Sequence, residues 1–171
     1  MVEIVRQNYY QNKAKFNMIK KEIIGLIGND YPIHHVGSTA IPKMLGKNII
    51  DILIGVKNTK ELDNIQEILI NHHYYLGKHC KKYYRFFASN PNETKSGDIH
   101  IHLAILTHQR YHDFLILKDY LLNNPLIANQ YVKYKKEIIQ KYGNNRQMYR
   151  RIKSIYVKKM LEDAKEVFKN N

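Results

Sequence analysis

Residues 48–56 form a short apolar run that contains a single acid, Asp51, and a run of this kind predicts a buried β-strand. Both faces of the strand are largely apolar, which is typical of a central strand covered on both sides. Asp51 is the exception, because burying an ionised carboxylate without a partner costs roughly several kcal/mol. With a period of two, the faces are Ile50, Ile52, Ile54 and Val56 on one side, and Ile49, Asp51, Leu53 and Gly55 on the other.

Residues 98–106 have the clearest alternation in the chain and predict a second strand of the same sheet. If the two strands are neighbours, their polar positions share a face, and we expect Asp51, His100 and His102 to converge in one cleft. His35 is in phase to join them, whereas His34 is expected on the opposite face. The alternating sets are Ile99, Ile101, Leu103 and Ile105 toward the core, and Asp98, His100, His102 and Ala104 away from it.

Helical periodicity predicts a helix over residues 5–27, a second helix capped by Asn58, and three more helices after Thr107, which caps the first of the three. No linker interrupts this order. The pattern therefore predicts one α+β domain over residues 1–171, a mixed β-sheet with packed helices and an α-helical C-terminal half. The remaining elements are strands over residues 33–36, 73–79 and 83–88, and a polar hairpin loop over residues 89–97.

The net charge of +13 in 171 residues is concentrated near the C-terminus, where residues 133–171 hold twelve Lys or Arg against four acids. One interpretation is an attraction for nucleotides or nucleic acid. The other is a solvated, lysine-rich helical face. Nucleic acid is not favoured as a partner, because the sequence contains no recognised nucleic-acid module or internal repeat.

The single cysteine, Cys80, allows no internal disulfide and suits a reducing compartment. The N-terminal residues lack the apolar segment of a signal peptide, and no apolar run approaches the length that crosses a membrane. These features predict a cytoplasmic protein that has no membrane partner.

Two motifs, His35–Pro42 and Lys47–Ile52, resemble the signature of the GrpB family. The resemblance covers nearly the whole chain, and it implies a nucleotidyltransferase-like fold of a kind found mostly in bacteria and sometimes fused to dephospho-CoA kinase. It continues through Arg85-Phe86-Phe87, through His100-Ile101-His102-Leu103, and into the C-terminal helices around Tyr149 and Lys153.

The resemblance also implies a phosphate site at Gly37, Ser38 and Thr39, where this fold holds a nucleotide's phosphates after a strand. Glycine permits close approach to the main chain, and the hydroxyl and following amides can donate hydrogen bonds. Taken alone, a Gly-Ser-Thr segment is a weak signal and is usually an ordinary turn. The cations that the motifs suggest for this site are Lys47, Arg85 and Lys153, although Arg85 could instead pair with an acid or stack on an aromatic ring.

Nucleotidyltransferases hold two divalent metals with two or three carboxylates. Asp51 matches the first acid of that set, but Leu53 stands at the second position, and a histidine of the His-x-His pair stands at the third. Asp51, His100 and His102 are the candidate catalytic residues. They could hold one divalent ion such as magnesium, manganese, zinc or iron, or they could form a hydrogen-bonded pair in which Asp51 fixes an imidazole.

We therefore expect a nucleotide or another phosphate-containing small molecule to bind in a cleft around Gly37, Ser38 and Asp51. Two functions remain open. The first is phosphoryl- or nucleotidyl-transfer activity. The second is a non-catalytic nucleotide-binding or regulatory module that has lost the second metal-binding carboxylate at Leu53.

Overall fold

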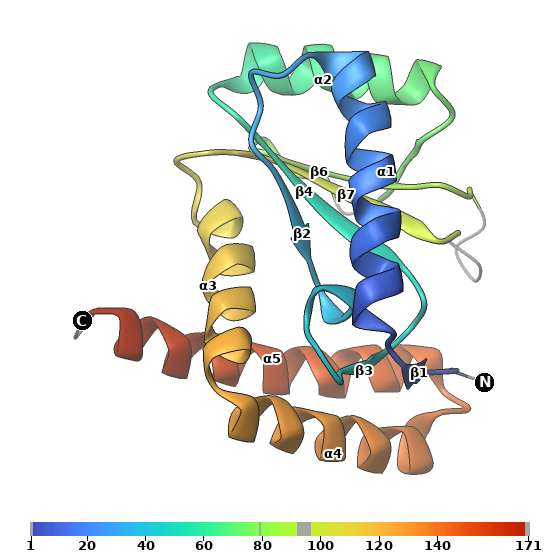
Figure 1. Cartoon of the computed structure of the whole chain (residues 1–171), viewed down its shortest axis with the longest axis vertical. Helices are drawn as coiled ribbons and strands as arrows, with labels where there is room; N and C mark the ends of the chain where they lie inside the picture. The colour runs from blue at the N-terminus through green and yellow to red at the C-terminus, as the bar shows by residue number, and fades with distance from the viewer. Residues whose placement is uncertain (1, 79, 92–96, 170–171) are drawn as a thin grey trace.

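A five-stranded mixed sheet lies at the centre of the computed structural model, which describes residues 2–78, 80–91 and 97–169 (Figure 1). The strand that carries Asp51, β4, has a neighbour on each side: β2 pairs with it antiparallel and β7 pairs with it parallel. The predicted interior position and the α+β class are both confirmed. In spatial order the strands are β2 (Ile33–Val36), β4 (Ile50–Val56), β7 (Ile99–Ile105), β6 (Tyr84–Ala88) and β5 (Tyr75–Leu76).

Helices α1 (Tyr9–Ile27) and α2 (Thr59–Asn71) cover one face of the sheet. The alternating isoleucines of β4 and β7 are buried against apolar stripes on these two helices, as their period of two requires. Helix α3 (Gln109–Asn123) covers the other face, where Tyr111 packs with Leu53 and Ala104. The sheet is therefore covered on both sides, as the apolar faces of β4 predict.

The C-terminal part of the chain is helical, as predicted, and continues from α3 into α4 (Pro125–Tyr142) and α5 (Arg146–Lys169). Figure 1 shows α4 and α5 side by side, running across the end of the molecule at which α1 begins. Ile41 and Met44, in the loop after β2, are buried against the three C-terminal helices, so this loop is attached directly to the helical half. That residues 1–171 form a single domain stays a prediction.

Two predicted helix starts are wrong by a few residues. The first helix begins at Tyr9, after Asn8, whose side chain accepts a hydrogen bond from the backbone N–H of Gln11. The residues before it form β1 (Val5–Arg6), which pairs with β3 (Leu45–Gly46), and this pairing with a distant segment overrides the helical pattern. His108, and not Thr107, caps α3, because its Nδ1 accepts from the N–H of Arg110 at 3.1 Å.

The predicted strands over residues 73–79 and 83–88 pair with each other as the short β5 and the longer β6. Residue 79 and residues 92–96 of the predicted hairpin loop lie outside the described residues. No helix within the described ranges is long and apolar enough to cross a membrane.

Candidate functional site

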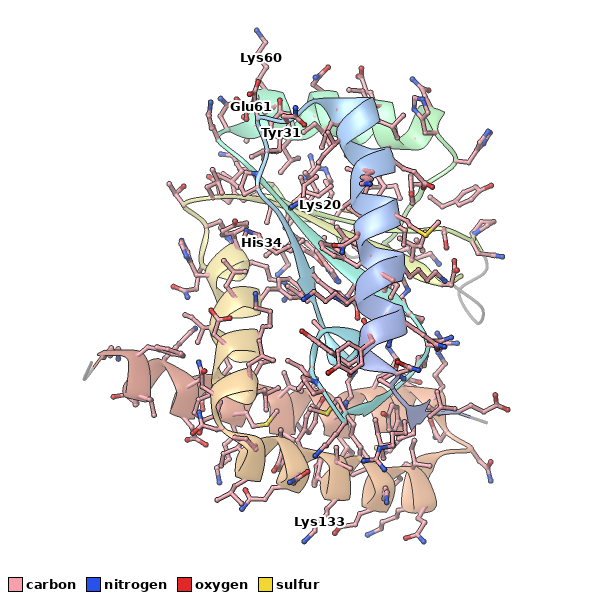
Figure 2. All side chains as sticks on the ribbon, in the orientation of Figure 1. Lys20, Tyr31, His34, Lys60, Glu61 and Lys133 are labelled. Carbon is pink, nitrogen blue, oxygen red and sulfur yellow. The ribbon has the colours of Figure 1, made fainter. Side chains whose placement is uncertain are left out.

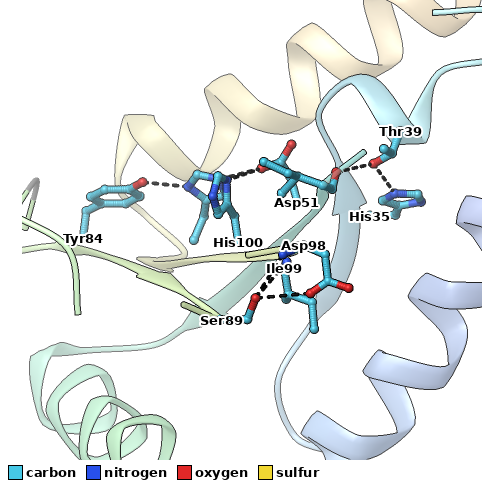
Figure 3. A network of polar contacts seen from close by, with 10 residues as sticks. His35, Thr39, Asp51, Tyr84, Ser89, Asp98, Ile99 and His100 are labelled. Atoms are coloured by element: carbon cyan, nitrogen blue, oxygen red, sulfur yellow. Dashed lines mark hydrogen bonds and ion pairs between the residues drawn. The ribbon is translucent and has the colours of Figure 1, made fainter. Parts of the chain in front are cut away.

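Asp51, His100 and His102 are brought together on the face of the sheet opposite to α1 and α2. The parallel register places His100 beside Asp51 and His102 beside Leu53, so the three polar side chains share a face. The Oδ1 atom of Asp51 lies 3.2 Å from His100 Nδ1 and 3.6 Å from His102 Nε2 (Figure 3). The first distance is that of a long hydrogen bond, and the second is that of a longer polar contact.

Tyr84, on β6, determines which nitrogen of His102 carries the proton. Its hydroxyl lies 2.7 Å from His102 Nδ1. Burial raises the pKa of Tyr84 to about 12, so the phenol keeps its hydrogen. Burial also lowers the pKa of His102 by more than Asp51 raises it, so the ring is neutral at pH 7. Tyr84 therefore donates to Nδ1, and the remaining ring proton sits on Nε2, facing Asp51.

Asp51 itself stays ionised. Burial alone would raise the pKa of this carboxyl, but the interactions with His100 and His102 outweigh burial and hold its pKa well below the usual range. Its second oxygen, Oδ2, packs against Gly37, where a Cβ atom would stand only 2.2 Å away. Gly37 also has a φ of 74°, so both the contact and the backbone require glycine.

The loop that follows Gly37 divides into an accessible part and a buried part. Ser38 is half-buried, and its Oγ accepts a hydrogen bond from Lys135 Nζ of α4 at 2.9 Å. Thr39 is fully buried, and its hydroxyl donates to the carbonyl oxygen of Ile49 at 3.2 Å and lies 2.9 Å from His35 Nε2. Thr39 therefore holds the loop against the sheet, and Ser38 is the hydroxyl available to the cleft.

Cations from three elements gather around this loop. Lys47, after β3, has its pKa lowered to about 8 by burial and by the charges of Arg146, Lys153 and Arg150 on α5. Lys135 has its pKa lowered to about 7 by burial and by Lys153. Burial also lowers the pKa of Lys153, against the opposing effect of Asp51. The charge of Asp51 opposes the lowering of the pKa at three of these basic side chains, Lys47, Lys135 and Lys153. The motifs of the sequence indicated two of the three, Lys47 and Lys153.

Arg85 is not part of this group. It lies opposite Leu103 in the register and so projects toward α2, on the other face of the sheet. There its guanidinium contacts Asp63 Oδ1 at 2.9 Å and Gln66 Oε1 at 2.6 Å. The structure therefore gives Arg85 an acidic partner, which was the alternative to a phosphate contact.

The predicted orientations of His34 and His35 are wrong, and the two are exchanged. In the antiparallel pairing of β2 with β4, Val36 and not His35 lies opposite Asp51. His35 therefore faces α1, where it stacks on Phe16 with 4.8 Å between ring centroids, and burial lowers its pKa to about 4. His34 lies on the Asp51 side, with its Nε2 at 2.9 Å from the hydroxyl of Tyr111.

Comparison with known proteins agrees with the motifs. The family model described as GrpB protein matches residues 2–163. The chain belongs to the GrpB family. The glutamate-rich protein GrpB of Alkalihalophilus pseudofirmus is 28% identical over 168 residues, which cover 94% of this chain and 95% of the relative.

Solved structures support the same fold for this GrpB-family protein. The crystal structure of the conserved protein GrpB from Enterococcus faecalis matches with a TM-score of 0.84 at 22% identity, over 97% of this chain and 99% of that one. A structure of the Cid1 poly(U) polymerase with MgGTP bound matches with a TM-score of 0.52 at 11% identity, over 84% of this chain and 45% of that one. The nucleotidyltransferase-like fold is therefore shown.

The donor set of this GrpB-family site does not fit the two-metal centre of nucleotidyltransferases. Among the described residues, no three His, Cys, Asp or Glu side chains are arranged to hold a metal ion. His100 and His102 both direct a ring nitrogen at the same oxygen of Asp51. Leu53, at the position of the second acid, is fully buried and offers no ligand.

Two residues of the site, Lys135 and Tyr84, were not predicted from the sequence. Lys135 had a signal in the sequence: a lysine occupies one position of an otherwise apolar helical stripe, and such a lysine needs a specific partner. Tyr84 had no comparable signal, because its partner depends on the register between β6 and β7. The stripe consists of the buried residues of α4: Ala128, Tyr131, Lys135 and Ile138.

Proposed function

We propose that this GrpB-family protein binds a nucleotide or another phosphate-containing small molecule at Gly37 and Ser38, beside Asp51. The observation that carries the proposal is the group of basic residues around this loop. Lys47 and Lys153 are half-buried, the charge of Lys153 lowers the pKa of Lys47, and the carboxylate of Asp51 acts on both lysines.

A bound anion would relieve an unfavourable arrangement of charge. Burial and neighbouring cations lower the pKa values of Lys47 and Lys135 to about 8 and about 7, so the protonated forms are disfavoured in the native protein. Phosphate oxygens in contact with Lys47, and near enough to the buried Lys135 to act on its charge through Ser38, would favour the protonated forms again. The proposal therefore includes proton uptake on binding near pH 8, because the anion raises the pKa values of both lysines.

The hydroxyl group of Ser38 can donate a hydrogen bond to such an anion. Lys135 Nζ is the donor of the 2.9 Å hydrogen bond, so this bond uses a lone pair of Ser38 Oγ. The hydrogen of the hydroxyl is left for another acceptor. Gly37, which lacks a side chain and is exposed, lets that acceptor approach the main chain.

Between the two functions that the family resemblance leaves open, Leu53 favours the binding or regulatory module. Nucleotidyl transfer by two metals requires a second carboxylate close to the first, and a fully buried leucine occupies that position. Transfer activity would have to rely on Asp51, whose carboxylate is held in place by His100 and His102.

Isothermal titration of the purified protein with ADP, ATP and pyrophosphate tests the proposal. Replacing Ser38 with Glu puts a negative charge at the loop, and Lys153→Ala removes a positive one; we expect each to weaken binding by about tenfold or more. Lys133→Ala is the matched control, because it removes the same charge from the exposed side of α4, where Figure 2 shows the side chain pointing away. Equal affinity of the Ser38→Glu variant and the unsubstituted protein would place any anion site elsewhere.

A further inference from the structure

Both carboxylate oxygens of Asp51 already contact other residues of the protein. Asp51 Oδ1 faces the two histidine nitrogens at 3.2 Å and 3.6 Å, and Oδ2 packs against Gly37. A divalent ion would have to displace these contacts and then find further oxygen ligands. Leu53 provides none, so this side of the cleft is poorly suited to a hard cation.

The basic residues near Ser38 include one lysine, Lys135, that is buried and fixed by contacts within the protein. Lys135 is 2% exposed, and its ammonium is held by three groups: Ser38 Oγ, the carbonyl oxygen of Leu45, and the ring of Tyr131, whose centroid lies 4.2 Å away. The ligand cannot reach this lysine, so it acts by positioning Ser38. Lys47 and Lys153 are partly exposed and can contact a ligand directly.

The charges around Asp51 and Ser38 act in opposite ways on a metal ion and on a phosphate. A divalent ion placed near Asp51 would meet one carboxylate and the repulsion of several lysines and arginines, whereas a phosphate would meet the attraction of the same groups. From this arrangement we infer that the phosphate ligand binds without a divalent metal, and that the basic residues of α4, α5 and the loop before β4 supply the counter-charge.

The inference rests on the proposed function and narrows its ligand class to free phosphate anions, with no coordinated metal. A magnesium complex carries less negative charge than the free pyrophosphate or nucleotide, so its attraction to this cleft is weaker. Asp51 then has a different task from that of a metal ligand. It limits the excess of positive charge, and it fixes the histidines that lie beside the loop.

Pyrophosphate titrations at pH 6.5, once in EDTA and once in excess magnesium, test the inference. We expect binding in EDTA and affinity at least about fivefold lower in magnesium, a difference of about 1 kcal/mol. Binding that occurs only with magnesium would overturn the inference and leave the proposed site intact. Binding in neither solution would overturn the proposed function, and the inference with it.

Asp51→Asn provides a second and sharper test. Without a metal, the carboxylate only repels the anion, so its removal should leave pyrophosphate affinity in EDTA unchanged or increase it a few-fold. If Asp51 ligates a metal that the phosphate needs, the same variant should lose binding. Lys133→Gln is the control for nonspecific charge effects, and a cooperative melting transition well above the temperature of the titration would show that each variant is folded.

A measurement without any phosphate keeps the inference testable if Asp51→Asn fails to fold. Paramagnetic Mn²⁺ bound at Asp51 would broaden the ring-proton resonances of His100 and His102. We expect these resonances to stay as sharp as that of the exposed His73. Selective broadening of His100 and His102 would overturn the inference.

Discussion

The two faces of strand β4 meet very different surroundings. On one face, Ile52 and the other even-numbered residues are completely buried beneath α1 and α2. On the other face, one residue away along the chain, Asp51 meets two histidines, a glycine loop and a group of lysines. The same backbone therefore supports an aliphatic core on one side and, beside the apolar cluster under α3, a group of ionisable residues on the other.

The two faces of the strand contribute differently to the protein. One contributes stability that does not depend on pH, and the other carries the ionisable groups of the proposed site. Burial of the apolar face contributes free energy without any dependence on pH, because none of its aliphatic side chains titrates. The polar face and the helix beside it hold groups whose pKa values depart from their ordinary range, so their contribution to stability changes with pH: the lowered pKa of Asp51 favours the native state at neutral pH, and the lowered pKa of Lys135 disfavours it. The three predictions below test this separation.

The largest expected effect is on the apolar face. Ile52→Ala removes a side chain that is 0% exposed, and we expect it to lower the free energy of unfolding by about 2–5 kcal/mol through lost burial and the cavity left behind. Asp51→Asn keeps the shape and one acceptor oxygen, so we expect a loss of about 1 kcal/mol. Urea denaturation measures both.

Ile70→Ala on α2 is the control for the apolar substitution, because Ile70 is 45% exposed, and we expect a change within about 0.5 kcal/mol. If Ile52→Ala and Asp51→Asn lowered the free energy of unfolding by similar amounts, the apolar face would not be the main source of stability, contrary to the prediction.

The second prediction concerns Lys135 and pH. Its pKa is about 7 in the native protein, below the ordinary 10.5, so between these pH values the unfolded chain holds a proton that the native protein has released. Stability due to this group therefore rises with pH across that window and is constant below it. We expect the free energy of unfolding, relative to that of Lys135→Met, to increase by about 1 kcal/mol per pH unit from pH 7.5 to 9.

Urea denaturation of both proteins at several pH values gives this difference, and the subtraction removes the titration of groups common to both. Lys133→Met should show no such trend relative to the unsubstituted protein, because Lys133 is exposed on the same helix. A difference that stays level with pH would mean that Lys135 keeps an ordinary pKa.

The smallest expected effect is at Tyr84. Tyr84→Phe leaves His102 Nδ1 without its donor, and we expect a loss of about 1 kcal/mol together with a shift of the His102 ring away from the Nε2–H tautomer. Nitrogen-15 NMR of the imidazoles reports the tautomer. Tyr83→Phe, at an exposed neighbouring position, is the control and should leave the His102 signals unchanged.

Part of the site could be predicted because it depends only on two regular strands. Alternation places Asp51, His100 and His102 on the same kind of face, and the structure brings them together once β4 and β7 are neighbours. The same reasoning failed for His35, because the face of a residue in β2 follows from its antiparallel partner in β4 and not from its distance to Gly37.

The sequence by itself determined what short-range patterns control: the buried faces of the strands, the helical C-terminal half, and the motifs of the GrpB family. Only the tertiary structure decided that Arg85 points to α2 and that Lys135, 97 residues from Ser38 along the chain, supports the loop. The physical reason is that alternation and helical period are set by local backbone geometry. Strand register and the packing of α4 against the loop depend instead on contacts between distant segments, which no local pattern encodes.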